Sequence, residues 1–317
     1  MAKLKFGIYG GGAAGSDSGM ARGPQDDPHL INEALSKLHL PSQEFLVRCY
    51  LHYIGNGKSE NLTPIHPKDY LLQGRKLDLV LGYQSKNGDI RDWILFIQNQ
   101  IREYGNSLAK IQIAEEPNLH NIPYVDGDSP NVRLAVIEGV IAAKEEIRKQ
   151  NLDVLVGFNG VPTFDSGNDF WRELGTKGNA MFYHSLDYVG LDFFPDVFRP
   201  IALEELKKAV ITVLTHFREV SLKEAKIDSS IPVHITENGW ATSPDRSYEK
   251  QAIVLENIVR TISEVKHTYN ITHYELFSLR DANTSNPDFF YQFGIMKDNY
   301  SPKPAFEVYR RLIAELG

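Results

Sequence analysis

The sequence predicts an α/β fold, a single (β/α)8 TIM barrel that spans residues 1–317. Eight short runs rich in β-branched and aromatic residues alternate with segments of helical periodicity. This alternation is typical of parallel strands joined by crossover helices, and the apolar character of the runs fits a sheet covered on both faces. Eight such units with no Gly/Ser-rich linker between them match the size of one barrel.

The expected strands and helices follow one another in order along the chain. Strands are expected at 3–10, 45–53, 77–83, 109–114, 152–158, 186–194, 232–237 and 273–279. Helices are expected at 29–39, 67–74, 89–106, 129–150, 168–176, 202–222, 246–267 and 304–316. The helix at 67–74 is the weakest, because Pro67 permits only a short one. A doubly wound open sheet is the alternative architecture.

A glycine-rich segment follows the first expected strand. GGGAAG at 10–15 satisfies the pattern G-x-G-x-x-G, which marks dinucleotide-binding folds when a helix follows it. Here Gly19, Gly23 and Pro24 follow, and they cannot propagate a helix. The second expected strand also ends without an acidic residue for a ribose hydroxyl. We therefore expect a loop at the mouth of the barrel.

Composition excludes several classes of function. The chain has 34 basic and 41 acidic residues, for a net charge of −7, whereas nucleic acids and anionic membranes attract basic surfaces. No apolar run reaches the length of about 18 residues that a membrane-spanning helix needs. Without a signal peptide in this chain we expect a cytoplasmic location, or secretion if the sequence has been trimmed. The single cysteine, Cys49, lies in an apolar run and is expected to be buried.

Two of the expected strands end in glutamates. IQIAEEPN at 111–118 contains Glu115 and Glu116, and VHITENGW at 233–240 contains Glu237. In a barrel these strand ends face the same cavity, with the fourth and seventh strands on opposite sides of the mouth. Cleavage of a glycosidic bond requires two carboxyl groups, one protonated and one ionised. A lone glutamate at a strand end is usually solvated or paired with lysine, but this pair favours catalysis.

Several motifs resemble the clan A retaining glycoside hydrolases. AEEPN at 114–118 resembles their NEP motif after strand four, and TENGW at 236–240 resembles the TENG nucleophile motif of the family 1 β-glucosidases. VGLDFF at 189–194 resembles their strand-six GINYY, and ELFSLRDAN at 275–283 is similar to the VWSLLDN of that family. The closing stretch at 293–313 is also similar. The resemblance covers strands four to eight well and the first hundred residues weakly.

The resemblance implies a retaining hydrolase of β-linked glycosides in which Glu116 is the general acid/base and Glu237 the nucleophile, about 5–5.5 Å apart. Glu115 stands where the family has an Asn that contacts the sugar 2-hydroxyl. Three hypotheses for Glu115 stay open: it binds a sugar hydroxyl, pairs with a nearby cation, or selects a cationic amino sugar. Arg48 matches an Arg of the family that orients the nucleophile. Because a buried Arg needs a carboxylate partner, we expect it to pair with Glu237, with a barrel-floor ion pair as the alternative.

Other substrate-binding candidates depart from the family pattern. Asp192 replaces an Asn, and the two residues after it are phenylalanines where the family has tyrosines. Phe277 stands in place of a tryptophan platform and could still stack on a sugar face. Trp240 and Trp171 are further candidate platforms. Asp281 either lines the cleft or pairs with Arg280. These departures indicate a divergent member.

The sequence implies no cofactor and no metal. Its ten histidines form no HExxH motif and no tight ligand cluster. The expected partner is a carbohydrate substrate, and the oligomeric state, the sugar, the linkage and exo or endo action carry no readable signal. Two alternatives remain: a non-catalytic carbohydrate-binding barrel, and a lyase or isomerase that uses the same glutamates as acid and base.

Overall fold

Eight parallel strands close into a barrel in the computed structural model, which describes residues 3–41, 43–164 and 169–317. The barrel strands are β1 (Lys5–Tyr9), β4 (Phe45–Gly55), β6 (Lys76–Tyr83), β7 (Leu108–Ile113), β8 (Leu155–Gly160), β9 (Tyr188–Asp192), β10 (Val233–Asn238) and β11 (Ile271–Leu276). Each pairs with its neighbours along the chain, and β1 pairs with both β4 and β11. This closure confirms the predicted (β/α)8 barrel and excludes an open sheet.

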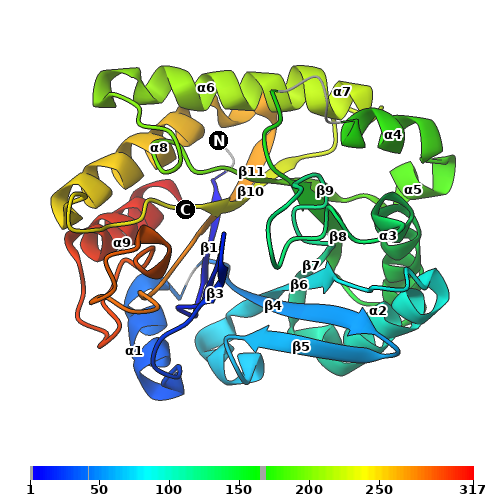
Figure 1. Cartoon of the computed structure of the whole chain (residues 1–317), viewed down its shortest axis with the longest axis horizontal. Coiled ribbons are helices and arrows are strands. Elements are labelled where there is room, and N and C mark those ends of the chain that lie inside the picture. Colours follow the sequence, from blue (N-terminus) through cyan, green and yellow to red (C-terminus); the bar gives the residue numbers. More distant parts are fainter. Residues whose placement is uncertain (1–2, 42, 165–168) are drawn as a thin grey trace.

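Helices surround the strands and cover the outside of the barrel (Figure 1). They are α1 (Pro28–Leu38), α2 (Ile90–Tyr104), α3 (Val132–Lys149), α4 (Phe170–Lys177), α5 (Ala180–Ser185), α6 (Leu206–His216), α7 (Leu222–Glu224), α8 (Tyr248–Tyr269) and α9 (Pro304–Leu316). Side chains of Asp27, Asp89 and Ser247 cap the first backbone N–H groups of α1, α2 and α8. Residue 168, at the start of one expected helix, lies outside the described residues.

The connection between β4 and β6 differs from the expectation. In place of a helix at 67–74, strand β5 (Lys58–Thr63) pairs antiparallel with β4 and is followed by two short 3-10 turns, η1 (Pro67–Tyr70) and η2 (Leu72–Gly74). His66 and Gln73 have positive φ, which interrupts a regular helix on both sides. The strict alternation of strands and helices therefore fails at this one crossover. Strand β5 was missed because its residues, KSENLT, are mostly polar and lack the apolar run of the other strands.

The glycine-rich segment forms a hairpin rather than an irregular loop. Strands β2 (Ala14–Ser16) and β3 (Gly19–Ala21) pair antiparallel, and Gly19 adopts a φ of +132° that other residues rarely adopt. Gly23 passes so close to the Ala282 carbonyl that a Cβ would collide with it. A Cβ on Gly15 would lie 3.8 Å from the Pro123 carbonyl oxygen, so the hairpin also approaches the loop after β7.

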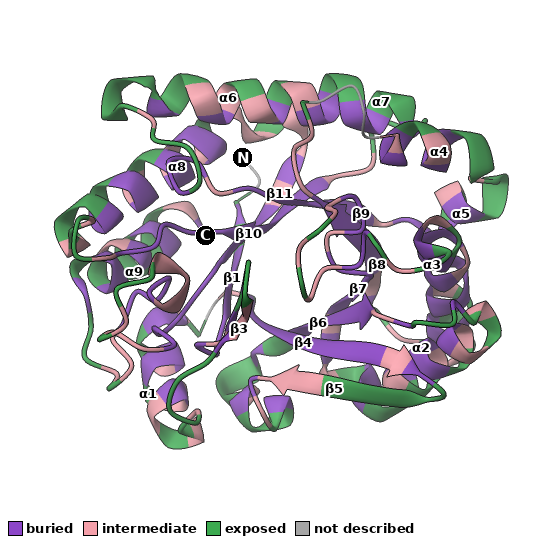
Figure 2. Cartoon of the chain, viewed as in Figure 1, coloured by how far each residue is buried: buried purple, intermediate pink, exposed green. Residues whose placement is uncertain are grey.

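Burial follows the layered architecture, with buried strands and helices exposed on their outer faces (Figure 2). Cys49 is fully buried, as expected. Trp93 is also fully buried and donates from its indole nitrogen to the Ala135 carbonyl at 3.0 Å. Trp171 packs against Phe158 and Phe217 in the core, so its prediction as a sugar platform was wrong. In the described part of the chain, no helix has both the length and the apolar character needed to cross a membrane.

Candidate active site

The two glutamates after β7 are held in place through their backbone. Ala114 and Glu116 have φ values of 69° and 43°, so the chain turns sharply where the strand ends. The Glu115 N–H donates to Asp126 Oδ2 at 2.7 Å, and the Glu116 N–H donates to Asn159 Oδ1 at 2.8 Å. These contacts orient two adjacent carboxyl groups differently: Glu115 is buried and Glu116 is partly exposed.

Glu237 lies near the end of β10 and is 7% exposed. The Tyr50 hydroxyl donates to its Oε1 at 2.5 Å, and Arg48 Nη2 lies 3.5 Å from the same atom. A hydrogen bond from Glu115 also lowers the pKa of Glu237, and Arg48 Nη2 lies within 3.6 Å of both carboxyls. The structure therefore brings Glu115 and Glu237 together from strands on opposite sides of the barrel.

Arg48 connects the carboxyls at the mouth to residues deeper in the barrel. The expected contact with Glu237 is present, but Asp78 is the closer partner, at 2.5 Å from Nη1. Arg48 Nη2 also donates to Gln112 Oε1 at 3.0 Å and lies 3.6 Å from Glu115 Oε2. Glu115 thus lies near a cation, as one of the three hypotheses expects, but farther from it than Asp78 and Gln112.

Asp192 ends β9 and is fully buried. Its two oxygens accept hydrogen bonds from Asn159 Nδ2 and from the Thr236 hydroxyl. Because Asn159 also accepts from the Glu116 N–H, it connects Asp192 with Glu116. We call Glu115, Glu116, Asp192 and Glu237 the mouth cluster.

Burial raises the pKa of every carboxyl in the mouth cluster, and repulsion between like charges raises it further for Glu115, Glu116 and Asp192. For Glu116 the largest cause is burial, followed by the charges of Asp192 and Glu237, and its pKa lies well above the usual range. The pKa of Glu115 is also well above its usual range, through burial and Glu237. Burial and Glu237 raise the pKa of Asp192 to about 8. The mouth cluster therefore retains protons near neutral pH.

Glu237 differs from the other three carboxyls. Burial raises its pKa as well. Arg48, and hydrogen bonds from Tyr50 and Glu115, act in the opposite direction. Among the mouth cluster, Glu237 is thus the carboxyl whose charged form is best supported by donors.

Three carboxyls of the mouth cluster could also hold a metal ion. Oxygen atoms of Glu115, Glu116 and Asp192 all lie within 4.8 Å of one another, and such oxygens suit hard cations. Both Asp192 oxygens already accept hydrogen bonds, so an ion would have to share them.

Two predicted substrate contacts are used elsewhere in the structure. The Asp281 carboxylate is fully buried and accepts from Lys303 Nζ at 2.7 Å, so it holds the loop after β11, whereas the Arg280 guanidinium pairs with Asp26. Trp240 is 2% exposed, with the Arg246 guanidinium 4.0 Å from its ring centroid. Its indole nitrogen donates to Asp196, so Trp240 is a packing residue rather than an open platform.

Phe277 lies at the mouth, one residue beyond β11. Its ring stacks on Tyr9 with centroids 5.1 Å apart, and 8% of its surface is exposed. The backbone N–H of Phe193, one of the two phenylalanines after Asp192, donates to the Glu237 carbonyl at 3.0 Å.

Sequence reasoning missed the polar residues that support the mouth cluster: Tyr50, Asp78, Gln112, Asp126 and Asn159. Four of them interrupt apolar strands, and a polar side chain there points into the barrel where it needs a partner. Tyr50 follows Arg48 by two residues, so both side chains face the same side of β4. That spacing could have identified Tyr50.

Comparison with known proteins shows a shared fold. No model of a known protein family matches the sequence, and no curated protein resembles it in sequence. A family 39 glycoside hydrolase from Bacteroides cellulosilyticus WH2 aligns with a TM-score of 0.63 at 15% identity, over 99% of this chain and 64% of that one. A Rhizomucor miehei β-1,3-glucanosyltransferase aligns with a TM-score of 0.59 at 13% identity, over 95% of this chain and 96% of that one.

A third similar structure is a Ruminococcus gnavus β-glucuronidase in complex with D-glucuronic acid, with a TM-score of 0.61 at 13% identity. The alignment covers 98% of this chain and 49% of that one. The chain thus spans about two thirds of the family 39 enzyme and half of the glucuronidase. At these identities the likeness establishes the barrel fold, while the resemblance to family 1 stays a prediction.

Proposed function

We propose that this protein is a glycoside hydrolase that cleaves a β-linked glycoside with retention of configuration. Glu237 is the nucleophile and Glu116 the general acid/base. Two observations support the proposal: the similar solved structures are a glycoside hydrolase, a glucanosyltransferase and a glucuronidase, and the barrel gathers four carboxyls at its mouth.

The contrast between Glu237 and Glu116 carries the proposal. Glu237 accepts a hydrogen bond from the Tyr50 hydroxyl and faces the Arg48 guanidinium. Both contacts stabilise the ionised form that a nucleophile needs. Glu116 is the more exposed glutamate after β7, and burial with the neighbouring charges of Asp192 and Glu237 favours its protonated form. A protonated acid beside an ionised carboxylate is the division of roles that glycosidic cleavage requires.

The proposed reaction has two steps. Glu116 gives its proton to the glycosidic oxygen while the Glu237 carboxylate attacks the anomeric carbon, and the aglycone leaves as an alcohol. Glu116 then removes a proton from water, which attacks the same carbon and releases the sugar and the free Glu237 carboxylate. Arg48 and Tyr50 hold the Glu237 oxygen that they contact in both steps.

The test is hydrolysis of aryl β-glycosides that carry different sugars, by the wild type and by glutamine variants. We expect Glu237→Gln to lose on the order of 10⁴-fold or more in kcat/KM on every substrate. Glu116→Gln should lose as much on alkyl glycosides but far less on dinitrophenyl glycosides, whose leaving group needs no proton. Product configuration, followed by NMR, should be retained.

Glu115→Gln is the matched control, because it changes the adjacent carboxyl. If Glu115→Gln, rather than Glu116→Gln, shows the dependence on leaving group, the acid has been misassigned. Azide adds an independent readout: with an alanine at the true acid/base it should restore turnover and give a β-glycosyl azide. Wild-type protein that binds sugars without cleaving any glycoside would contradict the proposal and favour a carbohydrate-binding barrel.

A further inference from the structure

Aromatic side chains from the loops after β9 and β11 form a continuous cluster at the mouth of the barrel. We call these residues the phenylalanine cluster: Phe194, Phe198, Phe277, Phe289, Phe290 and Phe293. The contacting rings have centroids 4.5 to 6.4 Å apart, which is the range of favourable aromatic pairs. The cluster joins two loops that are far apart in sequence.

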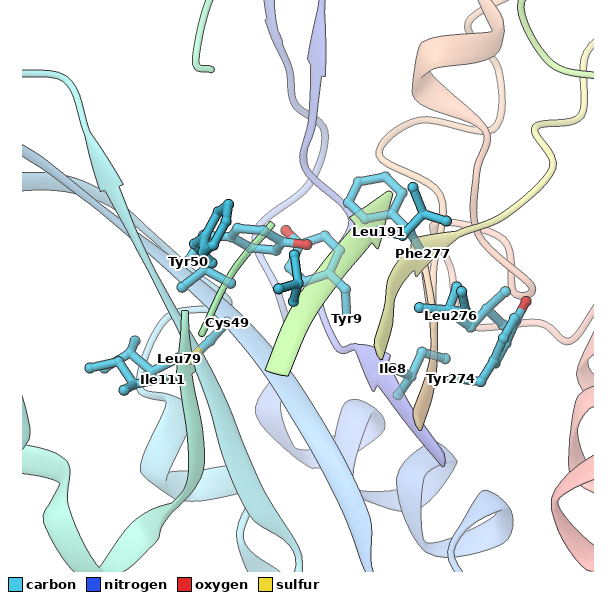
Figure 3. Close-up of a cluster of buried hydrophobic side chains, with 14 of the residues drawn as sticks. Ile8, Tyr9, Cys49, Tyr50, Leu79, Ile111, Leu191, Tyr274, Leu276 and Phe277 are labelled. Atoms are coloured by element: carbon cyan, nitrogen blue, oxygen red, sulfur yellow. The ribbon is translucent and has the colours of Figure 1, made fainter. Parts of the chain in front are cut away.

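One end of the phenylalanine cluster is connected to the proposed nucleophile through two tyrosine rings. Phe277 stacks on Tyr9, and the edge of Tyr9 meets Tyr50, in both cases with centroids 5.1 Å apart. Figure 3 shows Tyr50, Tyr9 and Phe277 following one another across one end of the core. Because the Tyr50 hydroxyl donates to Glu237, an unbroken series of rings leads from this carboxyl to the cluster.

The other end of the phenylalanine cluster is open to solvent. Phe198 is 59% exposed and contacts both Phe289 and Phe290 at 6.1 Å. These two rings, from η6 (Phe289–Tyr291), are only partly buried. An exposed phenylalanine gives up much of the free energy it would gain by burial, and contiguous exposed apolar groups mark binding sites.

Two charged side chains beside the open end, Arg246 and Asp288, already have partners within the protein. The Arg246 guanidinium lies 5.7 Å from the Phe289 ring centroid and donates to the carbonyls of Val197 and Asp196. The Asp288 carboxylate accepts from a backbone N–H of its own turn. These contacts hold the rings in place. A sugar would need partners for its hydroxyls, so groups already engaged in this way favour an apolar ligand.

We propose that the phenylalanine cluster is a binding subsite for the leaving part of the glycoside, and that this part is an alkyl or aryl group. The inference rests on the proposed function, which places the sugar at Glu237. The aglycone then extends over Phe277 toward Phe198. Its burial against the rings would add binding energy that the sugar alone does not provide.

The test is kcat/KM for a series of alkyl β-glycosides of the preferred sugar, from ethyl to octyl, below the micelle concentration. Alkyl leaving groups share nearly the same acidity, so the series varies apolar area alone. We expect kcat/KM to rise up to about fourfold for each added methylene that the rings bury. Phe198→Ala should lower the octyl value about tenfold and leave the ethyl value unchanged.

Leu95→Ala is the matched control, since Leu95 is 56% exposed but lies on α2, away from the loops after β9 and β11. It should leave both values unchanged. A flat series, or a disaccharide cleaved faster than the octyl glycoside, overturns this inference and leaves the proposed function standing.

If the wild type cleaves no glycoside, the proposed function fails and calorimetry decides the subsite separately. Octyl glycosides that bind to the wild type and no longer bind to Phe198→Ala would support the subsite. Octyl glycosides that fail to bind, or that bind equally to both proteins, would overturn it.

Discussion

The barrel interior holds buried charge in two layers that differ in balance. In the inner layer, which we define as Asp78, Lys110 and Glu275, the ammonium group lies between two carboxyls and all three side chains are fully buried. The mouth cluster gathers four carboxyls, and two of them, Glu115 and Glu237, lie within 3.6 Å of the Arg48 guanidinium. The inner layer offsets its charges and serves structure, whereas an excess of like charge costs stability and is retained at functional sites.

The pKa values reflect the same contrast. Burial raises the pKa of Asp78, but Lys110 and Arg48 outweigh burial and hold it below its usual value. In the mouth cluster burial and repulsion prevail, and Asp192 reaches about 8. Within the inner layer, burial and the charge of Asp78 raise the pKa of Glu275 to about 8, so Asp78 carries the negative charge that offsets Lys110. The cations close to each carboxyl thus decide which carboxyls stay ionised.

The largest predicted effect is the loss of the inner-layer cation. Lys110→Met removes the ammonium group between two buried carboxyls: Asp78 keeps Arg48 as its cationic partner, and Glu275 loses its ion pair. We therefore expect the free energy of unfolding to fall by about 3–5 kcal/mol. Urea denaturation measures this free energy. The control is Lys5→Met, which removes an exposed ion pair with Glu44 and should lower the free energy of unfolding by about 1 kcal/mol or less. Equal effects of the two substitutions would remove the distinction between a structural layer and a surface pair.

The sequence predicted the eight barrel strands because a strand buried on both faces is a continuous apolar run. It did not predict β5, whose residues are mostly polar, or the β2–β3 hairpin, whose strands have three residues each and contain glycine. Within the candidate site, position at a strand end located Glu115, Glu116 and Glu237.

The position of a residue at a strand end did not predict whether its side chain points into the mouth of the barrel or into the surrounding core. Asp281 follows β11 just as Glu116 follows β7, yet it faces Lys303 and is fully buried. Trp240 likewise turns beneath Arg246. Orientation depends on long-range partners such as Lys303, which is 22 residues from Asp281 along the chain, and no local pattern encodes that pairing.

The second prediction concerns the donor to Glu237. Tyr50→Phe removes the hydroxyl bound to Oε1, and a hydrogen bond to a charged group contributes about 1.5–3 kcal/mol, so kcat/KM should fall about ten- to a hundredfold. Because this hydrogen bond lowers the pKa of Glu237, its loss should move the acidic limb of the pH profile upward. Tyr53→Phe, which loses a bond to Asp92 instead, should leave that limb in place. If the acidic limb of Tyr50→Phe stays where it is in the wild type, Tyr50 does not lower the pKa of the nucleophile.

The third prediction is that stability falls as pH rises through the neutral range. Burial raises the pKa of Asp126 to about 7 and, with like charges, that of Asp192 and Glu275 to about 8. Below these values the folded chain binds protons that the unfolded chain has released, so deprotonation favours unfolding. We expect unfolding free energy to fall by at least about 1 kcal/mol between about pH 5 and pH 8. Midpoints of urea denaturation that rise between pH 5 and pH 8 would contradict the raised pKa values of these three carboxyls.

The smallest predicted effect distinguishes the two layers most directly. The pKa of Glu115 is raised by burial and by Glu237, so its carboxyl keeps a proton in the folded state that the unfolded state gives up. A glutamine has the shape of that protonated acid: its oxygen accepts from Gln112 and its amide donates to Glu237. Glu115→Gln should therefore leave unfolding free energy unchanged near pH 5 and raise it by about 1 kcal/mol near pH 8.

The matched control for this last prediction is Glu249→Gln, an exposed glutamate in the first turn of α8, which should change little at either pH. A stabilisation that appears equally at both pH values would arise from packing rather than from a proton. Destabilisation at the higher pH would mean that Glu115 is ionised and bound to Arg48. In that case the mouth cluster would be balanced in the same way as the inner layer, and its excess of charge could no longer be taken as a sign of function.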